Sequence, residues 1–158
     1  MVTAPILTDR LVLKPIGCAQ AARILTGDLG SLAAAAGWPQ ASTIEGLRLE
    51  AALGGSPACW LIVRAGIVIG ELGWKGGPGP DGDAEIGYSL VPDYRGHGYA
   101  SEAVGGFVEW ARNQPEVRRL VAQTSADNIA SRRVLEQSGF TVSDCKDGFF
   151  YWLRETAS

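Results

Sequence analysis

A glycine-rich turn, Arg95-Gly96-His97-Gly98-Tyr99-Ala100, lies between an apolar run and a run with helical periodicity. The first amides of a helix have no intrahelical partners, and the helix dipole adds partial positive charge, so such a junction binds anions. Gly96 and Gly98 lack a Cβ, which lets phosphate oxygens approach the backbone, and Arg95 adds a charged donor. This spacing predicts a phosphate site, although a tight turn with positive φ explains two glycines equally well.

Two familiar phosphate loops do not fit this turn. It lacks the Gly-Lys-Ser/Thr ending of a Walker A loop and the third glycine of the dinucleotide fingerprint. The strand before it follows an antiparallel meander rather than opening a βαβ unit. Nucleotide hydrolysis and NAD binding are therefore disfavoured, and a nucleotide-binding protein is the weakest of three interpretations.

The elements that must position this turn are predicted from periodicity. Strands are expected at residues 8–14, 58–64, 67–74, 84–91 and 118–124, with a terminal pair over 142–153, and helices at 18–25, 43–53, 100–111 and 128–137. Thr43 is the expected N-cap of the second helix and Gly54-Gly55 its end. Residues 27–42 give no clear pattern, because glycine and proline interrupt an alanine run. A strand-rich first half followed by a βαβα unit predicts one α+β domain over residues 1–158.

Composition disfavours several classes of protein. Hydrophobic residues make up 46% of the 158 and the net charge is −3, which suits an ordered globular chain and argues against nucleic-acid binding. There is no apolar run of membrane-spanning length and no signal-peptide layout, so no membrane partner and a cytoplasmic location are expected. One histidine and three scattered cysteines predict neither a metal site nor a disulfide framework.

Three separated motifs together resemble the GCN5-related N-acetyltransferase (GNAT) superfamily. They are the turn Arg95–Ala100, the opening segment Leu7–Pro15, and the stretch Ser125–Phe140, which contains Asn128 and Ser131. The last two stretches are similar to the ribosomal-protein N-acetyltransferase (RimJ/RimL-like) branch. The resemblance covers the chain from end to end. It implies a mixed, mainly antiparallel central sheet with flanking helices, whose fourth and fifth strands splay apart to hold acetyl-CoA.

The same resemblance implies cofactor-binding residues. Main-chain groups of the fourth strand would bind the pantetheine arm and the turn would bind the pyrophosphate; the residues concerned are Ser89, Leu90, Val91, Arg95, Gly96, His97, Gly98, Tyr99, Ala100 and Ser101. His97 is expected to be a spacer rather than a catalytic group. Asn128 is interpreted as a helix N-cap or a direct cofactor contact, and both roles can coexist. Ser131 would face the thiol end of CoA.

Acetyl transfer to an amine requires that the amine lose its proton, because an alkylamine with a pKa of ~10.4 is mostly charged at neutral pH. Glu85 is the first candidate base. It lies on the predicted fourth strand between Ala84 and Ile86, whose side chains would raise its pKa by desolvation. Glu71, on the preceding strand, is the alternative base.

The residue expected to protonate the departing thiolate differs from the one that is usual in this family. Many relatives place a tyrosine seven residues after the asparagine, and this position is Leu135 here. Ser131 therefore becomes the leading general acid, with Tyr88 and Tyr151 in reserve.

Two main interpretations follow. The first is an N-acetyltransferase in which a primary amine, from a protein N-terminus or a small molecule, attacks acetyl-CoA directly in a ternary complex. The second is a non-catalytic acyl-CoA-binding regulatory domain, which the leucine at position 135 favours. Gly105 and Gly106 inside the helix after the turn suit close packing against the sheet or a partner, which allows a homodimer.

Overall fold

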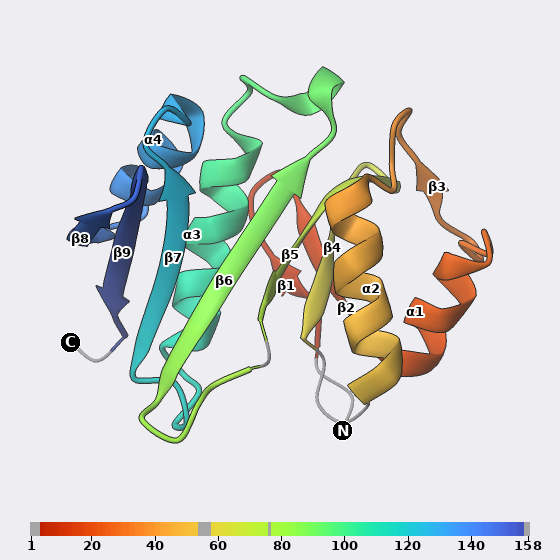
Figure 1. The fold of residues 1–158 in the computed structure, drawn as a ribbon. Coiled ribbons are helices and arrows are strands. Elements are labelled where there is room, and N and C mark those ends of the chain that lie inside the picture. Colours follow the sequence, from red (N-terminus) through yellow and green to blue (C-terminus); the bar gives the residue numbers. More distant parts are fainter. Residues whose placement is uncertain (1–3, 54–57, 76, 157–158) are drawn as a thin grey trace.

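The computed structural model describes residues 4–53, 58–75 and 77–156. Within these ranges, nine strands form one sheet in the order β1-β2-β4-β5-β6-β7-β9-β8, and β3 pairs with β5 outside this path (Figure 1). The elements in chain order are β1 Ile6–Leu7, β2 Val12–Ile16, α1 Cys18–Leu25, β3 Ala33–Ala34, α2 Ala41–Leu53, β4 Cys59–Arg64, β5 Ile67–Trp74, β6 Asp83–Leu90, the 3-10 turn Pro92–Tyr94, α3 Tyr99–Ala111, β7 Arg119–Ser125, α4 Ile129–Gln137, β8 Thr141–Lys146 and β9 Phe149–Glu155.

Helices cover the sheet on both faces (Figure 1). On one face, α3 and α4 enclose a core that includes Trp60, Phe107, Leu120 and Leu135. On the other face, α1 and α2 enclose a smaller core around Leu47. The sheet is therefore the middle layer of the molecule, and each strand divides its side chains between two different environments.

Strand β6 parts from β7 partway along its length. The two strands pair in parallel through Asp83↔Arg119, Ala84↔Leu120 and Glu85↔Val121, and the pairing ends there. Beyond this point they diverge, as Figure 1 shows. The other pairs on the main path of the sheet are antiparallel. The predicted α+β class, with a mixed, mainly antiparallel sheet and splayed fourth and fifth predicted strands, is thus confirmed.

The opening segment differs from the single strand predicted at residues 8–14. It forms the antiparallel pair β1–β2, with a turn in which the Thr8 N–H donates to the Leu11 carbonyl at 3.0 Å. Pro15 lies inside β2 instead of ending it. Because β1 pairs only with Val12 and Leu13, β2 is an edge strand at Pro15, a position that tolerates a missing amide.

The start of α2 also differs from the prediction. The helix begins at Ala41, so Thr43 lies in its first turn rather than at its N-cap, and the hydroxyl of Thr43 accepts the Gln40 N–H at 3.1 Å. The predicted end at Gly54-Gly55 lies outside the described residues. In the uncertain segment 27–42, the pair Ala33–Ala34 forms β3 beside β5. In the described part of the chain, no helix is long and apolar enough to cross a membrane.

Candidate active site

The predicted phosphate-binding turn connects the free end of β6 to α3. Gly96 and Gly98 have left-handed φ values of +80° and +82°, and α3 begins directly afterwards at Tyr99. Its N-cap, Gly98, has no side chain to bond the first-turn amides, so those of Tyr99, Ala100 and Ser101 are left for another acceptor. A Cβ at Gly96 would meet no atom within 4 Å. The turn is therefore open and presents helix-start amides, which fits an anionic group such as a pyrophosphate.

Two side chains at this junction, one in the turn and one in the first turn of α3, bond to protein groups rather than facing an anion site. The Arg95 guanidinium turns back along the strand, where its Nε donates to the Leu90 carbonyl at 2.9 Å and its Nη2 to Gln40 Oε1 at 3.3 Å. The expected phosphate contact of Arg95 is therefore absent from this conformation. Similarly, Ser101 Oγ donates to Gln137 Oε1 at 2.7 Å, which links α3 to α4 and leaves the amide of Ser101 for a ligand.

The main chain of β6 offers a free edge where β7 has departed. The Val91 N–H donates to the Ile69 carbonyl at 2.9 Å, so this amide is engaged within the sheet. Residues of an antiparallel strand alternate between the two neighbours, which turns Ser89 toward β5 as well. The main-chain groups of Tyr88 and Leu90 point the other way, and of these the Leu90 carbonyl accepts the hydrogen bond from Arg95 Nε. The free edge is therefore offset by one residue from the predicted one.

At the start of α4, two candidate acids lie together. The Ser131 N–H donates to Asn128 Oδ1 at 3.2 Å, which confirms Asn128 as the helix N-cap. The Tyr88 hydroxyl reaches across from β6 and donates to the Ser131 carbonyl at 3.3 Å. Burial raises the pKa of Tyr88, and its hydrogen bond to Ser131 offsets part of this rise. Leu135 is fully buried in the core, so it contributes packing here.

Glu85 lies on the opposite face of β6. Its carboxylate pairs with Lys75 Nζ at 3.0 Å, and its side chain is 37% exposed. The expected enclosure by Ala84 and Ile86 is wrong, because successive side chains of a strand point to opposite faces and these two enter the α3 core. Glu85 instead lines a cavity of about 320 Å³, together with Asp83, Arg119, Val121, Ala122, Gln123, Ser143, Tyr151, Trp152 and Leu153. Tyr151 is thus separated by the sheet from Ser131.

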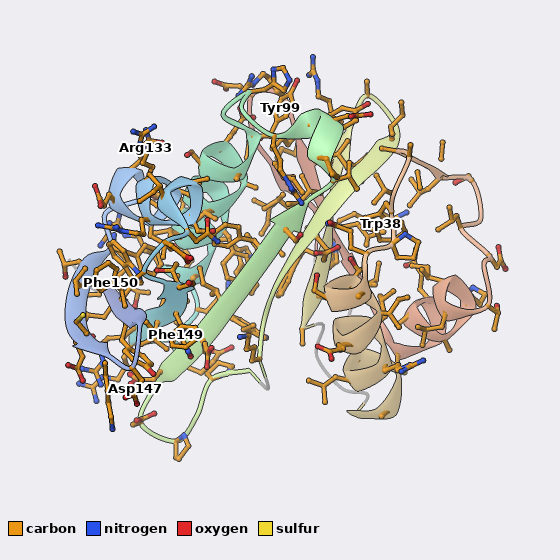
Figure 2. The ribbon with its side chains drawn as sticks, turned by 45° about the horizontal axis from the view of Figure 1, so that its top comes forward. Trp38, Tyr99, Arg133, Asp147, Phe149 and Phe150 are labelled. Carbon is orange, nitrogen blue, oxygen red and sulfur yellow. The ribbon has the colours of Figure 1, made fainter. Side chains whose placement is uncertain are left out.

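Glu71, the alternative base, lies opposite Ser89 on the same face as Glu85. Its Oε1 accepts the Trp38 Nε1–H at 3.1 Å and the Thr43 hydroxyl. Burial raises the pKa of Glu71, and these two hydrogen bonds offset part of the rise. Figure 2 shows Trp38 beside the start of α2, whereas Tyr99 marks the start of α3.

Sequence reasoning misses Gln40. Its Nε2 donates to Ser89 Oγ at 2.8 Å, and its Oε1 accepts from Arg95. Gln40 therefore links the start of α2 both to β6 and to the turn before α3. Its position directly before a helix is the only signal in the sequence. Among the described residues, no group of three or more His, Cys, Asp or Glu side chains is arranged to hold a metal ion.

A sheet that opens between two parallel strands, beside a helix start suited to a phosphate, defines the fold class of acyl-CoA-type transferases expected above. The chain belongs to the GNAT acetyltransferase family: residues 10–141 match the family described as "Acetyltransferase (GNAT) domain".

Individual relatives agree with this family. The chain is 30% identical over 99 residues to the uncharacterized N-acetyltransferase YjdG of Bacillus subtilis, covering 61% of this chain and 59% of YjdG. It is 35% identical over 66 residues to YnaD of the same organism, covering 42% of this chain and 36% of YnaD. The matches therefore span less than two thirds of the length of these relatives.

Solved structures share the fold over nearly the whole chain. A GNAT acetyltransferase from Bacillus anthracis superposes with a TM-score of 0.70 at 16% identity, covering 97% of this chain and 99% of that one. RimL, a ribosomal L7/L12 alpha-N-protein acetyltransferase in complex with coenzyme A, gives a TM-score of 0.69 at 19% identity, covering 96% and 98%. The microcin C7 self-immunity acetyltransferase MccE, in complex with acetyl-CoA and AMP, gives 0.64 at 16%, covering 93% of each chain.

Proposed function

We propose that the protein is an acetyl-CoA-dependent N-acetyltransferase that acts on a primary amine. The observation that carries this proposal is the end of β6–β7 pairing after Glu85↔Val121, next to a helix start whose first amides have no side-chain cap among the described residues. The pyrophosphate of acetyl-CoA would bind the amides at the start of α3. The amide-rich pantetheine arm would bind the main-chain edge at Tyr88 and the Leu90 N–H, beside the Leu90 carbonyl that Arg95 holds. Family membership and the CoA-bound neighbours support the same cosubstrate.

The proposed reaction is a direct attack in a ternary complex. The amine nitrogen forms a bond to the thioester carbonyl carbon, the carbon–sulfur bond breaks, and the amine loses one proton while the thiolate gains one. Glu85 is the proposed base because it lies at the last paired rung before the strands part. Its ion pair with Lys75 holds the carboxylate at this position, and a carboxylate can accept the proton of the amine.

Ser131 is the proposed donor of the proton to the thiolate. It lies in the first turn of α4, held by Asn128, on the face of the sheet that carries the phosphate-binding turn. Tyr88 contacts it directly and is the second candidate. A thiol has a pKa near ~8.5 and leaves readily as thiolate, so the acid is expected to contribute less than the base.

The cavity beside Glu85 is the proposed acceptor side. It opens on the face opposite α3, so acceptor and cosubstrate would approach the parted strands from different faces. Asp83 in this cavity is paired with both Nε and Nη2 of Arg119, at 2.7 and 3.0 Å, which leaves Glu85 as the more available carboxylate for a cationic amine. The fold shared with RimL supports a protein N-terminus as one acceptor class, and small amines are the other.

Thermal-shift measurements would test the cosubstrate first. A ligand at a hundredfold excess over its Kd stabilises by about 2.7 kcal/mol, so CoA and acetyl-CoA should raise the melting temperature whereas ATP and NAD should not. A shift with ATP alone would support a nucleotide-binding protein. No shift with either CoA species would refute the proposal.

Turnover would then be measured by mass spectrometry over a panel of amines and N-terminal peptides. Glu85→Gln and Glu71→Gln separate the two bases, and Ser131→Ala and Tyr88→Phe the two acids. The proposal expects the larger loss of kcat in Glu85→Gln and in Ser131→Ala. Binding of acetyl-CoA without turnover over the whole panel would favour the non-catalytic acyl-CoA-binding domain.

A further inference from the structure

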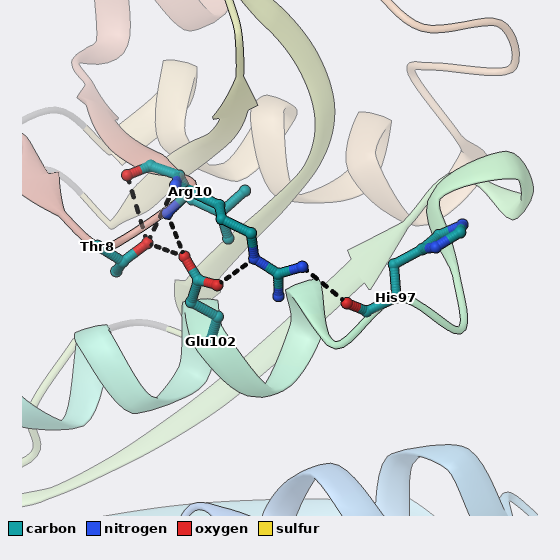
Figure 3. A network of polar contacts seen from close by, with 5 residues as sticks. Thr8, Arg10, His97 and Glu102 are labelled. Atoms are coloured by element: carbon teal, nitrogen blue, oxygen red, sulfur yellow. Dashed lines mark hydrogen bonds and ion pairs between the residues drawn. The ribbon is translucent and has the colours of Figure 1, made fainter.

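A polar network joins the start of the chain to the phosphate-binding turn (Figure 3). In the β1–β2 turn, the Thr8 hydroxyl donates to Glu102 Oε2 at 2.5 Å and the Arg10 N–H donates to the same oxygen at 2.7 Å. Arg10 Nε donates to Glu102 Oε1 at 2.7 Å. Burial alone would raise the pKa of Glu102, but its bonds to Thr8 and Arg10 outweigh burial and lower it. The carboxylate on the first turn of α3 is therefore charged and fully engaged.

Arg10 extends this network onto three consecutive residues of the turn. Its Nη1 donates to the His97 carbonyl at 3.0 Å, and its Nη2 would lie 3.3 Å from a Cβ at Gly98. Its guanidinium carbon lies 4.5 Å from the centre of the Tyr99 ring. One side chain thus bridges the carboxylate of α3 and the main chain just before that helix.

The bond to the His97 carbonyl orients an amide. This carbonyl and the Gly98 N–H belong to one trans peptide group and point in opposite directions. Since Arg10 holds the carbonyl, the Gly98 N–H points away from Arg10. Gly98 is left-handed and has no side chain to restrain it, so this peptide group would otherwise have more freedom to rotate. Arg10 also neutralises Glu102, whose charge would repel an anion at the helix start.

We propose that Arg10 is a positioning residue for the pyrophosphate of the cosubstrate, acting through the Gly98 peptide and Glu102 without touching the ligand itself. This inference rests on the proposed acetyl-CoA-dependent function. Arg10 precedes Glu102 by 92 residues in the sequence. The inference gives the Thr8–Arg10 turn a role in cosubstrate binding as well as in folding.

The test compares Arg10→Ala and Arg10→Lys with the control Arg64→Ala. Arg64 stacks on the same Tyr99 ring at 5.1 Å, so its removal changes the net charge equally. Lysine keeps the charge of Arg10 but cannot bridge Glu102 and His97 as a guanidinium does. KM would be measured for acetyl-CoA and for S-acetyl-pantetheine, which lacks the pyrophosphate, and thermal melting would verify folding.

Both Arg10 variants are expected to raise KM for acetyl-CoA about tenfold, the effect of losing one hydrogen bond, with kcat little changed. KM for S-acetyl-pantetheine should stay as in the wild type, and Arg64→Ala should leave both within about twofold. If Arg10 only stabilised the fold, Arg10→Lys would melt lower and raise both KM values together, which would overturn the inference. Equal KM values for acetyl-CoA in Arg10→Lys and Arg64→Ala would overturn it too. A wild type that does not bind acetyl-CoA would refute the proposed function itself.

Discussion

Gly96→Ala tests whether the turn before α3 binds phosphate, and Gly148→Ala is its matched control. The φ values are +80° and +81°, and at neither position would a Cβ meet an atom within 4 Å. Each substitution therefore costs mainly the left-handed backbone penalty of roughly 1–2 kcal/mol. For a chain of this size, about 2–4 °C is lost per kcal/mol, so both variants should melt roughly 2–8 °C below the wild type.

Binding should separate the two variants. Gly96 borders the start of α3, where a methyl group would occupy space that phosphate oxygens must enter, whereas Gly148 lies in the β8–β9 turn. We expect Gly96→Ala to raise KM for acetyl-CoA by about tenfold or more, equivalent to ~1.4 kcal/mol, with kcat nearly unchanged. Gly148→Ala should leave KM for acetyl-CoA as in the wild type.

The assay is the initial rate against acetyl-CoA at saturating amine, with calorimetric titration of CoA as an independent measure of binding. Equal CoA affinities in both variants and the wild type, together with equal losses of melting temperature, would refute the reasoning. The glycines would then serve only the positive φ of a tight turn, the interpretation that the sequence alone leaves open.

Three further predictions concern other residues. Burial raises the pKa of Glu71, so the stability that protonated Glu71 contributes is present below pH 4.5, its ordinary pKa, and is lost as pH rises through the raised pKa. Urea unfolding over a pH series should show the wild type losing stability relative to Glu71→Gln across that window. A constant difference in the free energy of unfolding would contradict this. Cys59 is buried, and its pKa is raised to about 12 by burial and, to a smaller extent, by neighbouring carboxylates. A thiol reagent at mildly alkaline pH should therefore modify the exposed Cys18 and Cys145 in the native protein and Cys59 only after unfolding. Leu135→Tyr should destabilise by about 1–3 kcal/mol through overpacking without raising kcat, since the position is fully buried; a more active variant would show that the usual tyrosine can be restored.

Periodicity predicted the second half of the fold well, because its elements follow local rules. The helix predicted at residues 100–111 is α3, in which Ala103, Val104, Phe107 and Val108 repeat at helical spacing and are buried. The single strand predicted at residues 8–14 was wrong, because contacts distant in the sequence determine the structure there. The Thr8 hydroxyl and the Arg10 amide bond to Glu102, more than ninety residues away, and this contact fits a turn rather than a strand.

The candidate site was predicted in outline, and its side-chain directions were not. The turn, the capping Asn128 and the helix that carries Ser131 lie where sequence patterns place them. The direction of Arg95 depends on Gln40, whose segment has no periodicity. The desolvation expected for Glu85 could have been rejected from the sequence itself, because neighbours at i±1 on a strand face the opposite side.

This alternation along β6 also bears on the proposed two-substrate reaction. Its even-numbered side chains, including Tyr88, face the helices that carry the phosphate-binding turn and Ser131, and its odd-numbered ones, Glu85 and Ser89, face the opposite layer. The proposed base, Glu85 on β6, and the proposed acid, Ser131 on α4, are on opposite faces of the sheet. They can act on one reacting centre only where the neighbouring strand is missing, and β7 leaves directly after Glu85. Moving this point of departure along β6 would separate the groups again, so the length of the β6–β7 pairing is itself a determinant of the proposed chemistry.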